Sequence, residues 1–401
     1  MSTLSPTLPR PSSPRLGSID AYRGLVMFLM MAEVLRLSSG GRATGGAVWT
    51  FLGGQQTHSE WIGCSLHDLI QPSFSFLVGV ALPFSIASRR ARGQSIPFMT
   101  LHAVWRALIL IVLGFFLRSL SSSRTNFTFE DTLTQIGMGY VFLFLLGFCP
   151  KRDWWIALAV FLVGYWLAFA LYPLPPADFI YDRLGVSTSW LADHRLTGFA
   201  AHWNKNSNFA WAYDTWFLNL FPRPKTFIYN DGGYATLSFI PTLGTMILGL
   251  IAGGILRDDR TPAARIRWFV IAGVIGLVSA WALNATGVCP VVKRIWTPSW
   301  TLFSGGWCFL FMAAFYALVD LARLRPAVFP LIVIGMNSIA AYCIAHLFEG
   351  LIGGALNRHL PVDTFSKLGR AYQPFLHGAA VLLVYWLILF WMYRRRLFLR
   401  I

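Results

Sequence analysis

Ten apolar stretches, each about as long as a lipid bilayer is thick, constrain this chain more than any other feature of its sequence. A helix needs roughly 20 apolar residues to cross a hydrocarbon core. Runs of that kind begin near Ile19, Asp68, Leu101, Leu133, Trp154, Ala235, Trp268, Ser299, Ala327 and Pro374. Of 401 residues, 56% are hydrophobic and only 12% are charged, unlike an ordinary soluble domain. We therefore expect an all-α, polytopic integral membrane helix bundle with about ten transmembrane helices.

The formal net charge of +16 has two explanations, nucleic acid binding or membrane topology. The basic residues cluster between the apolar runs, as at residues 89–92 and 394–396. Cytoplasmic loops of membrane proteins carry such clusters. Ten spans with the clusters inside place both termini in the cytoplasm, and no nucleic acid partner is expected. The same topology places the loop around His58 and the segment 173–234 outside.

The two ends of the chain and its cysteines give simpler expectations. Residues 1–17 are rich in Ser and Pro and are expected to form a disordered cytoplasmic tail, followed by a single transmembrane domain over 18–401. No small-residue cleavage site follows the first apolar run, so we interpret it as a retained helix rather than a signal peptide. The five cysteines show neither metal-ligand spacing nor a disulfide framework, and no metal site is expected.

The long segment 173–234 is rich in aromatic and titratable residues: Trp190, Trp203, Trp211, Trp216, His194, His202, Asp193 and Asp214. Tryptophan rings beside polar groups suit sugars, whose C–H faces stack on the rings while their hydroxyls form hydrogen bonds. An interfacial aromatic belt explains the same composition. We expect an extracytoplasmic cap over the helix ends, with the belt as the open alternative.

The first candidate for chemistry is His58, in a polar loop that runs into the apolar helix beginning near Asp68. A loop histidine is most often simply solvated. A carboxylate one turn inside a spanning helix is costly without a partner, so Asp68 suggests that the loop folds back and that Asp68 accepts the imidazole N–H. His67 is a rival partner or catalyst, although its position turns it about 100° around the helix from Asp68.

Two charged pairs lie in the first apolar run. Asp20 and Arg23, at positions i and i+3, can form an ion pair that anchors the helix end. Glu33 lies late in the run, with Arg36 at i+3 as its obvious local partner. Glu33 either extends to the outer face or lines the same cavity as His58.

Two later stretches supply further candidates. Lys293 and Arg294 lie in CPVVKRIWTPSW, a short outer loop that either anchors a helix end or binds an anionic ligand group. Asn337 and His346 fall in the ninth apolar run. A buried Asn usually joins helices by hydrogen bonding, and His346 is expected to be a satisfied bundle histidine.

Six motifs, taken in order, resemble a known family. They are LGSIDAYRGLVMFLMM, HSEWIGCSLHDLIQPSFSFLVGV, DTLTQIGMGYVFLFLL, SFIPTLGTMILGLIAG, PVVKRIWTPSWTLFSGGWCFLFMAAFYALVD and GMNSIAAYC. The order is similar to that of the heparan-alpha-glucosaminide N-acetyltransferases and their bacterial relatives, over nearly all of the membrane portion. That family moves an acetyl group from cytosolic acetyl-CoA to the amino group of a terminal glucosamine across the membrane. The resemblance implies a transmembrane acyltransferase that uses acetyl-CoA.

The resemblance also implies roles for individual residues. The pattern H-x-x-W-x-G followed by D-L makes His58 the catalytic histidine and Asp68 its orienting partner. The residues expected near the acceptor are Trp61, Glu33 and Asn337, and those expected near CoA are Lys293, Trp296 and Arg23, with the 89–92 cluster as a further candidate for its phosphates. The family's Asn at the outer end of the first span is replaced here by the Glu33 region and a longer Gly-rich loop, and Val292 replaces the Asn of P-x-N-K-x-x-W-T. Both departures fall near the expected acceptor and donor pocket, so they bear on which substrate is bound more than on the class of reaction.

The leading hypothesis is that His58 is a general base, with an acetyl-imidazole intermediate as the alternative. A secondary transporter or flippase is the runner-up from another class, and a scaffold that has lost catalysis is the third. The expected partners are acetyl-CoA, an amino-sugar or glycan acceptor, membrane lipid and, as one option, a second copy of the chain. Because the chain lacks the extra lumenal domain of the animal enzyme, a bacterial inner membrane is the expected location.

Overall fold

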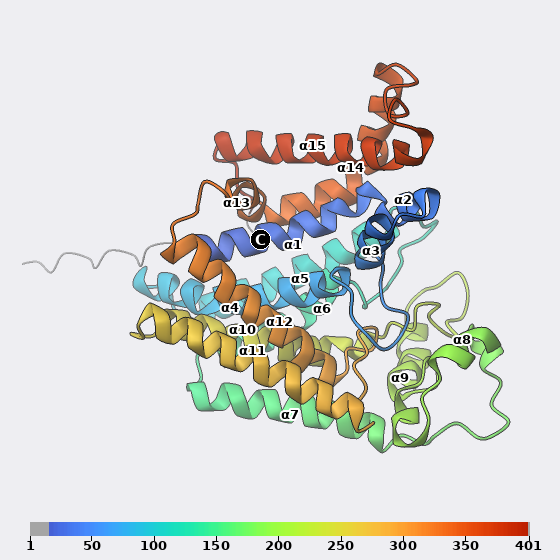
Figure 1. Ribbon diagram of the computed structural model, residues 1–401. Coiled ribbons are helices and arrows are strands. Elements are labelled where there is room, and N and C mark those ends of the chain that lie inside the picture. Colours follow the sequence, from blue (N-terminus) through green and yellow to red (C-terminus); the bar gives the residue numbers. More distant parts are fainter. Residues whose placement is uncertain (1–15, 400–401) are drawn as a thin grey trace, which may run out of the picture.

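The computed structural model describes residues 16–399, and this part of the chain folds into helices that run roughly side by side (Figure 1). Within that range the only β-structure is an isolated antiparallel bridge between Ile62 and Val292. The all-α prediction is confirmed for the described residues. The tail expected over 1–17 lies outside them except for Leu16 and Gly17, and Gly17 already begins the first helix.

Among the described residues, eight helical segments are long and apolar enough to cross a membrane, as expected of an integral membrane protein. They are His67–Ala91 (η2, His67–Leu69, with α4, Ile70–Ala91), α5 (Ile96–Ser119), α7 (Lys151–Ala170), Thr236–Arg257 (η6, Thr236–Ser238, with α10, Phe239–Arg257), α11 (Pro262–Ala285), Pro298–Leu321 (α12, Pro298–Phe315, with the π-helical η7, Tyr316–Leu321), α14 (Ser338–His359) and Arg370–Arg394 (η8, Arg370–Tyr372, with α15, Gln373–Arg394).

The other two expected spans are helical but shorter. They are α1 (Gly17–Met31), which continues as the 3₁₀ turn η1 (Ala32–Leu35), and α6 (Thr132–Leu146). A 15-residue helix is about 22 Å long at 1.5 Å per residue, which is less than the roughly 30 Å of a hydrocarbon core. Length and composition therefore support eight of the ten expected spans.

The ninth expected span is not one continuous helix. A short helix, α13 (Phe329–Met336), ends at Asn337, and α14 begins at Ser338. The backbone of Asn337 is not helical (φ −128°, ψ 40°). The prediction that Asn337 lies within a single span with His346 is therefore wrong, because the chain breaks at the Asn.

The centre of the bundle is the contact between α4 and α10, and α10 is almost entirely buried. Two glycines permit this contact. A Cβ atom on Gly79 would lie 1.9 Å from the carbonyl oxygen of Met246, and one on Gly249 would lie 1.9 Å from that of Phe76. By contrast, α11 and α15 leave most of their apolar surface exposed, as suits helices that face lipid.

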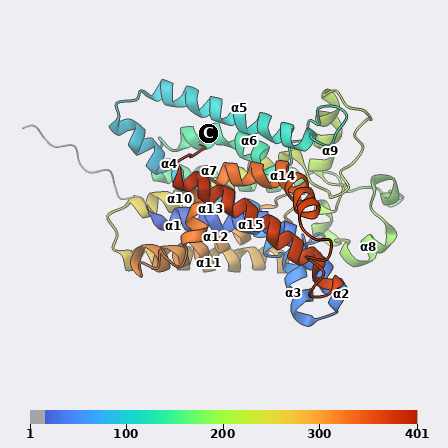
Figure 2. The same cartoon turned by 90° about the horizontal axis from the view of Figure 1, so that it is seen from above.

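Apart from α13, the short helices outside the spanning segments gather at one end of the bundle (Figures 1 and 2). They comprise α2 (Leu37–Thr44) and α3 (Ala47–Gln55) after the first helix, and η3 (Tyr181–Leu184), α8 (Thr188–His194), η4 (Gly198–Trp203), α9 (Phe209–Phe217) and η5 (Leu218–Leu220) within the segment 173–234. That segment is folded, and it packs through Trp203 on a buried apolar cluster that includes Phe169, Val292 and Trp61. The loop that carries His58 lies at the same end.

Candidate active site

Two loops that are far apart in sequence lie against each other at this end. The loop 56–66 forms the bridge between Ile62 and Val292, and the backbone N–H of Gly63 donates to the carbonyl oxygen of Val291 at 3.3 Å. Gly63 has φ +127°, a conformation that favours glycine. This pairing brings Lys293, which follows Val292, next to His58.

Arg294 ties the two loops to the segment 173–234. Its Nε donates to the carbonyl oxygen of Ser59 at 3.3 Å, and its Nη1 donates to that of Gly232 at 2.8 Å. Arg294 therefore fixes the position of the loop that carries His58, and its guanidinium is already occupied by protein carbonyl groups.

His58, Asp68 and Lys293 form a compact group. His58 Nδ1 lies 2.7 Å from Asp68 Oδ1, and the Lys293 ammonium lies 3.2 Å from the same oxygen and 3.0 Å from His58 Nδ1. An ammonium only donates, whereas the carboxylate only accepts. Because the contact of Nδ1 with the carboxylate is the shortest of the three, we assign both the Nδ1–H of His58 and the ammonium as donors to Asp68, and the 3.0 Å contact between the ammonium and Nδ1 is then a contact of two donors and not a hydrogen bond. The lone pair of His58 then lies on Nε2, as a general base requires.

Asp68 is fully buried and has partners on both oxygens. Its Oδ2 accepts from the backbone N–H groups of Ser59 at 3.1 Å and Ser65 at 3.0 Å, and from the Ser65 hydroxyl at 3.2 Å. A buried carboxylate is tolerated when it is paired and hydrogen-bonded in this way. The η2 turn at the start of α4 therefore supplies a fixed anion beneath the imidazole.

Burial sets the charge state of the group. It lowers the pKa of His58 below its ordinary value of 6.5, and the Lys293 charge lowers it further, although the hydrogen bond to Asp68 acts in the opposite direction. Burial also lowers the pKa of Lys293, which the Asp68 charge partly offsets. The imidazole is therefore neutral at pH 7 and can accept a proton.

His67 also contacts His58, in keeping with the alternative that treated His67 as a rival partner or catalyst. The two imidazole rings lie 4.4 Å apart between centroids, and His67 Nε2 is 3.4 Å from Glu33 Oε1. The expected turn of about 100° does not separate His67 from the site, because the loop 56–66 crosses the helix start and reaches both His67 and Asp68. Glu33 pairs with His67 rather than with Arg36.

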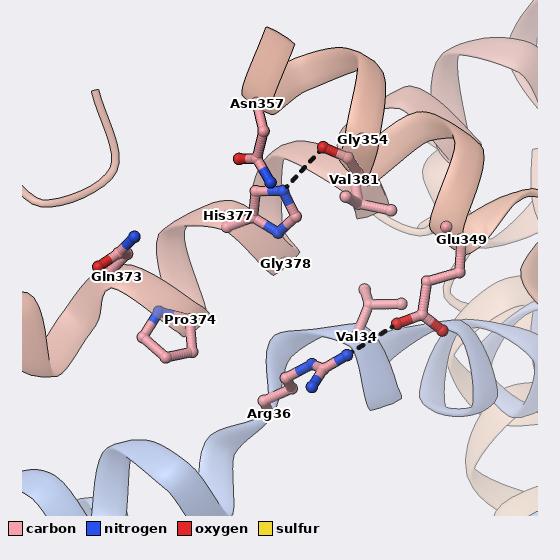
Figure 3. A pocket seen from close by; sticks show the side chains of 12 residues that line it. Val34, Arg36, Glu349, Gly354, Asn357, Gln373, Pro374, His377, Gly378 and Val381 are labelled. Carbon is pink, nitrogen blue, oxygen red and sulfur yellow. Dashed lines mark hydrogen bonds and ion pairs between the residues drawn. The ribbon is translucent and has the colours of Figure 1, made fainter. Parts of the chain in front are cut away.

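Arg36 instead faces a separate cavity of about 400 Å³ between η1, α14 and α15 (Figure 3). There its Nη2 lies 3.3 Å from Glu349 Oε1, and across the cavity His377 Nε2 lies 3.2 Å from the carbonyl oxygen of Gly353. Neither His58 nor Asp68 lines this cavity.

The cavity beside His58 measures about 430 Å³. Side chains from α1, η1, η2, α4, α5, α6, α14, the two loops, the residues before α6 and the end of the segment 173–234 line it: Met27, Met30, Glu33, His58, His67, Ile70, Gln71, Phe74, Arg118, Glu130, Thr132, Tyr234, Lys293, Tyr342 and His346. We call it the catalytic cavity. Its charged walls are able to bind a polar or anionic substrate.

Several residues of the catalytic cavity were not expected from the sequence. Arg118, at the end of α5, and Tyr342, on α14, both contact Asp131, at 3.0 and 3.3 Å. Gln71 and His346 also line the wall. They come from α4, α5 and α14, and local spacing links only Tyr342 and His346, which lie at i and i+4 on α14. The only signal in the sequence was that polar residues are costly within apolar runs.

A second cavity, of about 590 Å³, also reaches His58. It is lined by Ala47, Thr50, Phe51, Gly54 and Gln55 of α3 and by Thr57, His58, Ser59, Cys64 and Ser65 of the next loop, and we call it the α3 groove. The His58 side chain is 37% exposed and lines both cavities.

Two tryptophans expected at the site are structural instead. Trp61 is 1% exposed, and its indole N–H donates to the carbonyl oxygen of Trp203 at 3.1 Å, which fastens the loop 56–66 to the segment 173–234. Trp296 is buried, and its indole N–H donates to the Thr245 hydroxyl on α10 at 3.2 Å. Neither residue lines the catalytic cavity.

Arg23 and Asn337 lie away from His58. Arg23 is ten residues before Glu33 along α1 and η1, a rise of about 15 Å, and its Nη1 lies 3.8 Å from Asp20, as the sequence suggests. The Asn337 amide donates to the carbonyl oxygen of Leu397 at 3.0 Å and accepts from the N–H of Leu399 at 3.1 Å. Asn337 therefore fixes the C-terminal residues. Within residues 16–399, no cluster of His, Cys, Asp and Glu is arranged to bind a metal ion.

Comparison with known proteins gives a distant relationship. No family model matches the chain. Heparan-alpha-glucosaminide N-acetyltransferase of Homo sapiens is 25% identical over 435 residues, which cover 97% of this chain and 60% of that protein. The enzyme of Mus musculus is 25% identical over 443 residues, covering 99% of this chain and 62% of that protein. The chain thus spans about 60% of the length of these relatives.

Proposed function

Starting from the distant family relationship of this chain to the heparan-alpha-glucosaminide N-acetyltransferases, we propose that it is a transmembrane acetyltransferase. It moves the acetyl group of acetyl-CoA to an amino-sugar or related glycan acceptor, with His58 as the general base. One observation carries the proposal. Asp68 fixes Nδ1 of a partly exposed, neutral imidazole, and that imidazole lines two cavities.

The chemistry follows from this geometry. The acceptor nitrogen attacks the thioester carbonyl carbon, so that a C–N bond forms while the C–S bond breaks. His58 Nε2 takes the proton that the nitrogen loses, and Asp68 stabilises the imidazolium that results. The proton then passes to the CoA thiolate, which leaves as a thiol. In the alternative route, Nε2 itself attacks the thioester and carries the acetyl group.

Lys293 has a different role from the one expected. The sequence suggested contact with CoA, but its ammonium is buried against Asp68 and His58. We assign it as a positioning residue that keeps the imidazole neutral. Arg118, which lines the catalytic cavity and is 54% exposed in its side chain, is the better candidate for an anionic group of acetyl-CoA.

The proposed topology has ten spans, with α1 and α6 as the two shorter ones. It places both termini in the cytoplasm of a bacterium and the segment 173–234 outside the inner membrane, as a cap. The placement of charge on α4 supports it. The helix begins beside Asp68 and carries Arg89 and Arg90 in its last turn, and its 22 residues separate the two ends by about 33 Å. The basic cluster therefore lies at the face opposite His58.

The direct test is turnover by the full chain in lipid nanodiscs. With acetyl-CoA and glucosamine, we expect release of CoA thiol together with acetylated amine. His58→Ala is expected to lower this rate by roughly 10²–10⁴-fold while leaving the affinity for acetyl-CoA nearly unchanged. Transport of a sugar into proteoliposomes without any need for acetyl-CoA would instead support the transporter alternative. Lipid contacts and a homodimer remain predictions.

A further inference from the structure

The α3 groove gives His58 a second access route, and its chemistry differs from that of the catalytic cavity. The catalytic cavity presents the half-exposed guanidinium of Arg118, the candidate for an anionic group of acetyl-CoA. Among the described residues that line the α3 groove, none carries a fixed charge, and His58 is the only one that titrates near neutral pH. If each substrate approaches His58 through its own cavity, the α3 groove suits the acceptor and not CoA.

The groove has both polar and apolar lining side chains. Thr57 and Ser59, the chain neighbours of His58, supply hydroxyl groups, and Thr50 supplies another from α3. Phe51, which follows Thr50 on α3, also lines the groove and is 64% exposed. An occupant that fills the whole groove would therefore place a polar group at the imidazole and apolar atoms over Phe51.

The apolar surface continues beyond the groove. Val48 is 70% exposed and Leu52 is 38% exposed, and both lie within four residues of Phe51 on α3. In the facing loop, Ile62 is 43% exposed and Leu66 is 37% exposed. On α3, Val48 and Phe51 lie at i and i+3 and share one face, and exposed apolar side chains gathered in this way outside the spanning helices mark a site of interaction with a partner or with lipid.

The fold presents this surface in a fixed position. On another side of α3, Trp49 packs on Tyr372 and Phe375, with ring centroids 5.8 and 5.1 Å apart. Those two residues lie at the start of the spanning segment Arg370–Arg394. Gly53 contacts the backbone of Ser38 on α2 so closely that a Cβ atom would lie 2.8 Å from it. The exposed face of α3 is therefore held at the level where a spanning helix begins, which is where lipid headgroups lie.

We infer that the α3 groove binds an acceptor that is carried on a lipid: its amino-sugar group reaches His58 while its hydrocarbon chain covers Phe51 and Val48. This rests on the proposed acetyl transfer and narrows its substrate class from amino sugars in general to amphiphilic ones. Transfer forms the same C–N bond and releases the same CoA thiol as for a soluble amine. The lipid part contributes binding energy only.

The test compares two acceptors that share a reacting amine, free glucosamine and an alkyl glucosaminide with a 12-carbon chain. It uses the full chain in nanodiscs and measures kcat and KM for each. In the variant Val48→Ser/Phe51→Ser, we expect KM for the alkyl glucosaminide to rise roughly ten- to hundredfold, because two apolar contacts are lost. KM for glucosamine and for acetyl-CoA should change by less than about twofold. Val362→Ser is the matched control, since Val362 is 92% exposed in the loop before Arg370–Arg394 and is not part of α3.

Three outcomes would overturn the inference. The first is wild-type protein that shows no preference for the alkyl glucosaminide over glucosamine. The second is an equal loss with both acceptors, which would mean that α3 only supports His58. The third is a change of oligomeric state in the variant with both KM values unchanged, which would make this face an interface between copies. All three differ from failure of the proposed function, in which wild-type protein acetylates neither amine.

Discussion

The Lys293 ammonium lies 3.2 Å from Asp68 Oδ1, and both groups are buried beside the imidazole of His58. The pair places one positive and one negative charge against the same ring nitrogen. Asp68 fixes the orientation of the ring and Lys293 opposes its protonation. Together they produce an imidazole that is oriented and yet neutral, which is the state that a general base needs.

The first prediction concerns pH. A base must be neutral to act, so the rate rises with pH through the pKa of His58, which burial and Lys293 hold below 6.5. Lys293→Met removes the positive charge and leaves Asp68, so this pKa rises and the acid limb of kcat/KM moves to higher pH. A profile between about pH 5 and 9 measures the shift. An acid limb that stays in place, or moves to lower pH, would show that Lys293 does not act on the imidazole.

The second prediction separates orientation from stability. Asp68→Asn replaces the carboxylate that accepts from the Nδ1–H of His58 with an amide, whose NH2 group donates. The ring then loses its fixed orientation, so turnover should fall by roughly 10²–10⁴-fold. The substitution also leaves Lys293 buried without a counter-ion. Removing one partner of a buried ion pair lowers the free energy of unfolding by about 3–5 kcal/mol. The double variant Asp68→Asn/Lys293→Met should recover much of the thermal stability without recovering turnover. Recovery of both, or of neither, would contradict the assigned roles.

The third prediction concerns Asp214 in α9. Burial raises the pKa of Asp214 to about 7, with Glu130 adding to this and the hydrogen bonds from Thr236 and the charge of Arg223 acting against it. Between about pH 4 and 7 the folded chain binds a proton that the unfolded chain releases. This contribution to stability is present at low pH and is lost as pH rises through 7.

Asp214→Asn should therefore raise the unfolding temperature above pH 7 and change it little near pH 4. The Asn can still accept from the backbone N–H of Thr236, as Asp214 Oδ2 does at 3.0 Å. Asp193→Asn, which changes an exposed aspartate of the same segment, serves as the control. Thermal unfolding of the three proteins at several pH values checks this, and an equal effect of Asp214→Asn at all pH values would refute it.

The fourth prediction tests the topology with single cysteines and a membrane-impermeant thiol reagent, in a variant that lacks the five natural cysteines. Cysteines in the loop 56–66 and in the segment 173–234 should react from outside in intact cells. Cysteines at 89–92 and 394–396 should react only after the membrane is opened. Labelling of the 173–234 segment from the cytoplasm would reverse the proposed direction of acetyl transfer.

Some of these relationships could be predicted from the sequence. The loop before α4 is short, and a buried carboxylate needs a partner, so the contact of His58 with Asp68 follows from local reasoning. Glu33 was expected either at the outer face or in the cavity, and it lines the cavity. The helical segments themselves followed from the length of the apolar runs.

Other relationships depend on contacts between distant parts of the chain. Lys293 reaches His58 only because Ile62 and Val292 pair across two loops, and no local pattern encodes that pairing. Trp61 and Trp296 are of a residue type that is common in binding sites. Large aromatic side chains also fill cores, however, and here both are buried. The break at Asn337 was missed because an apolar run does not show where its backbone changes direction.

The central claim is that His58, and not its neighbour His67, accepts the proton of the acceptor. The two rings are 4.4 Å apart, so proximity alone does not distinguish them, but only His58 is held by Asp68. The most direct measurement is the single-turnover rate of acetyl transfer for His58→Ala and His67→Ala, each at saturating acetyl-CoA. We predict a loss of roughly 10²–10⁴-fold for His58→Ala and a loss of less than about tenfold for His67→Ala. If His67→Ala abolished transfer while His58→Ala retained it, the account of the site would be wrong.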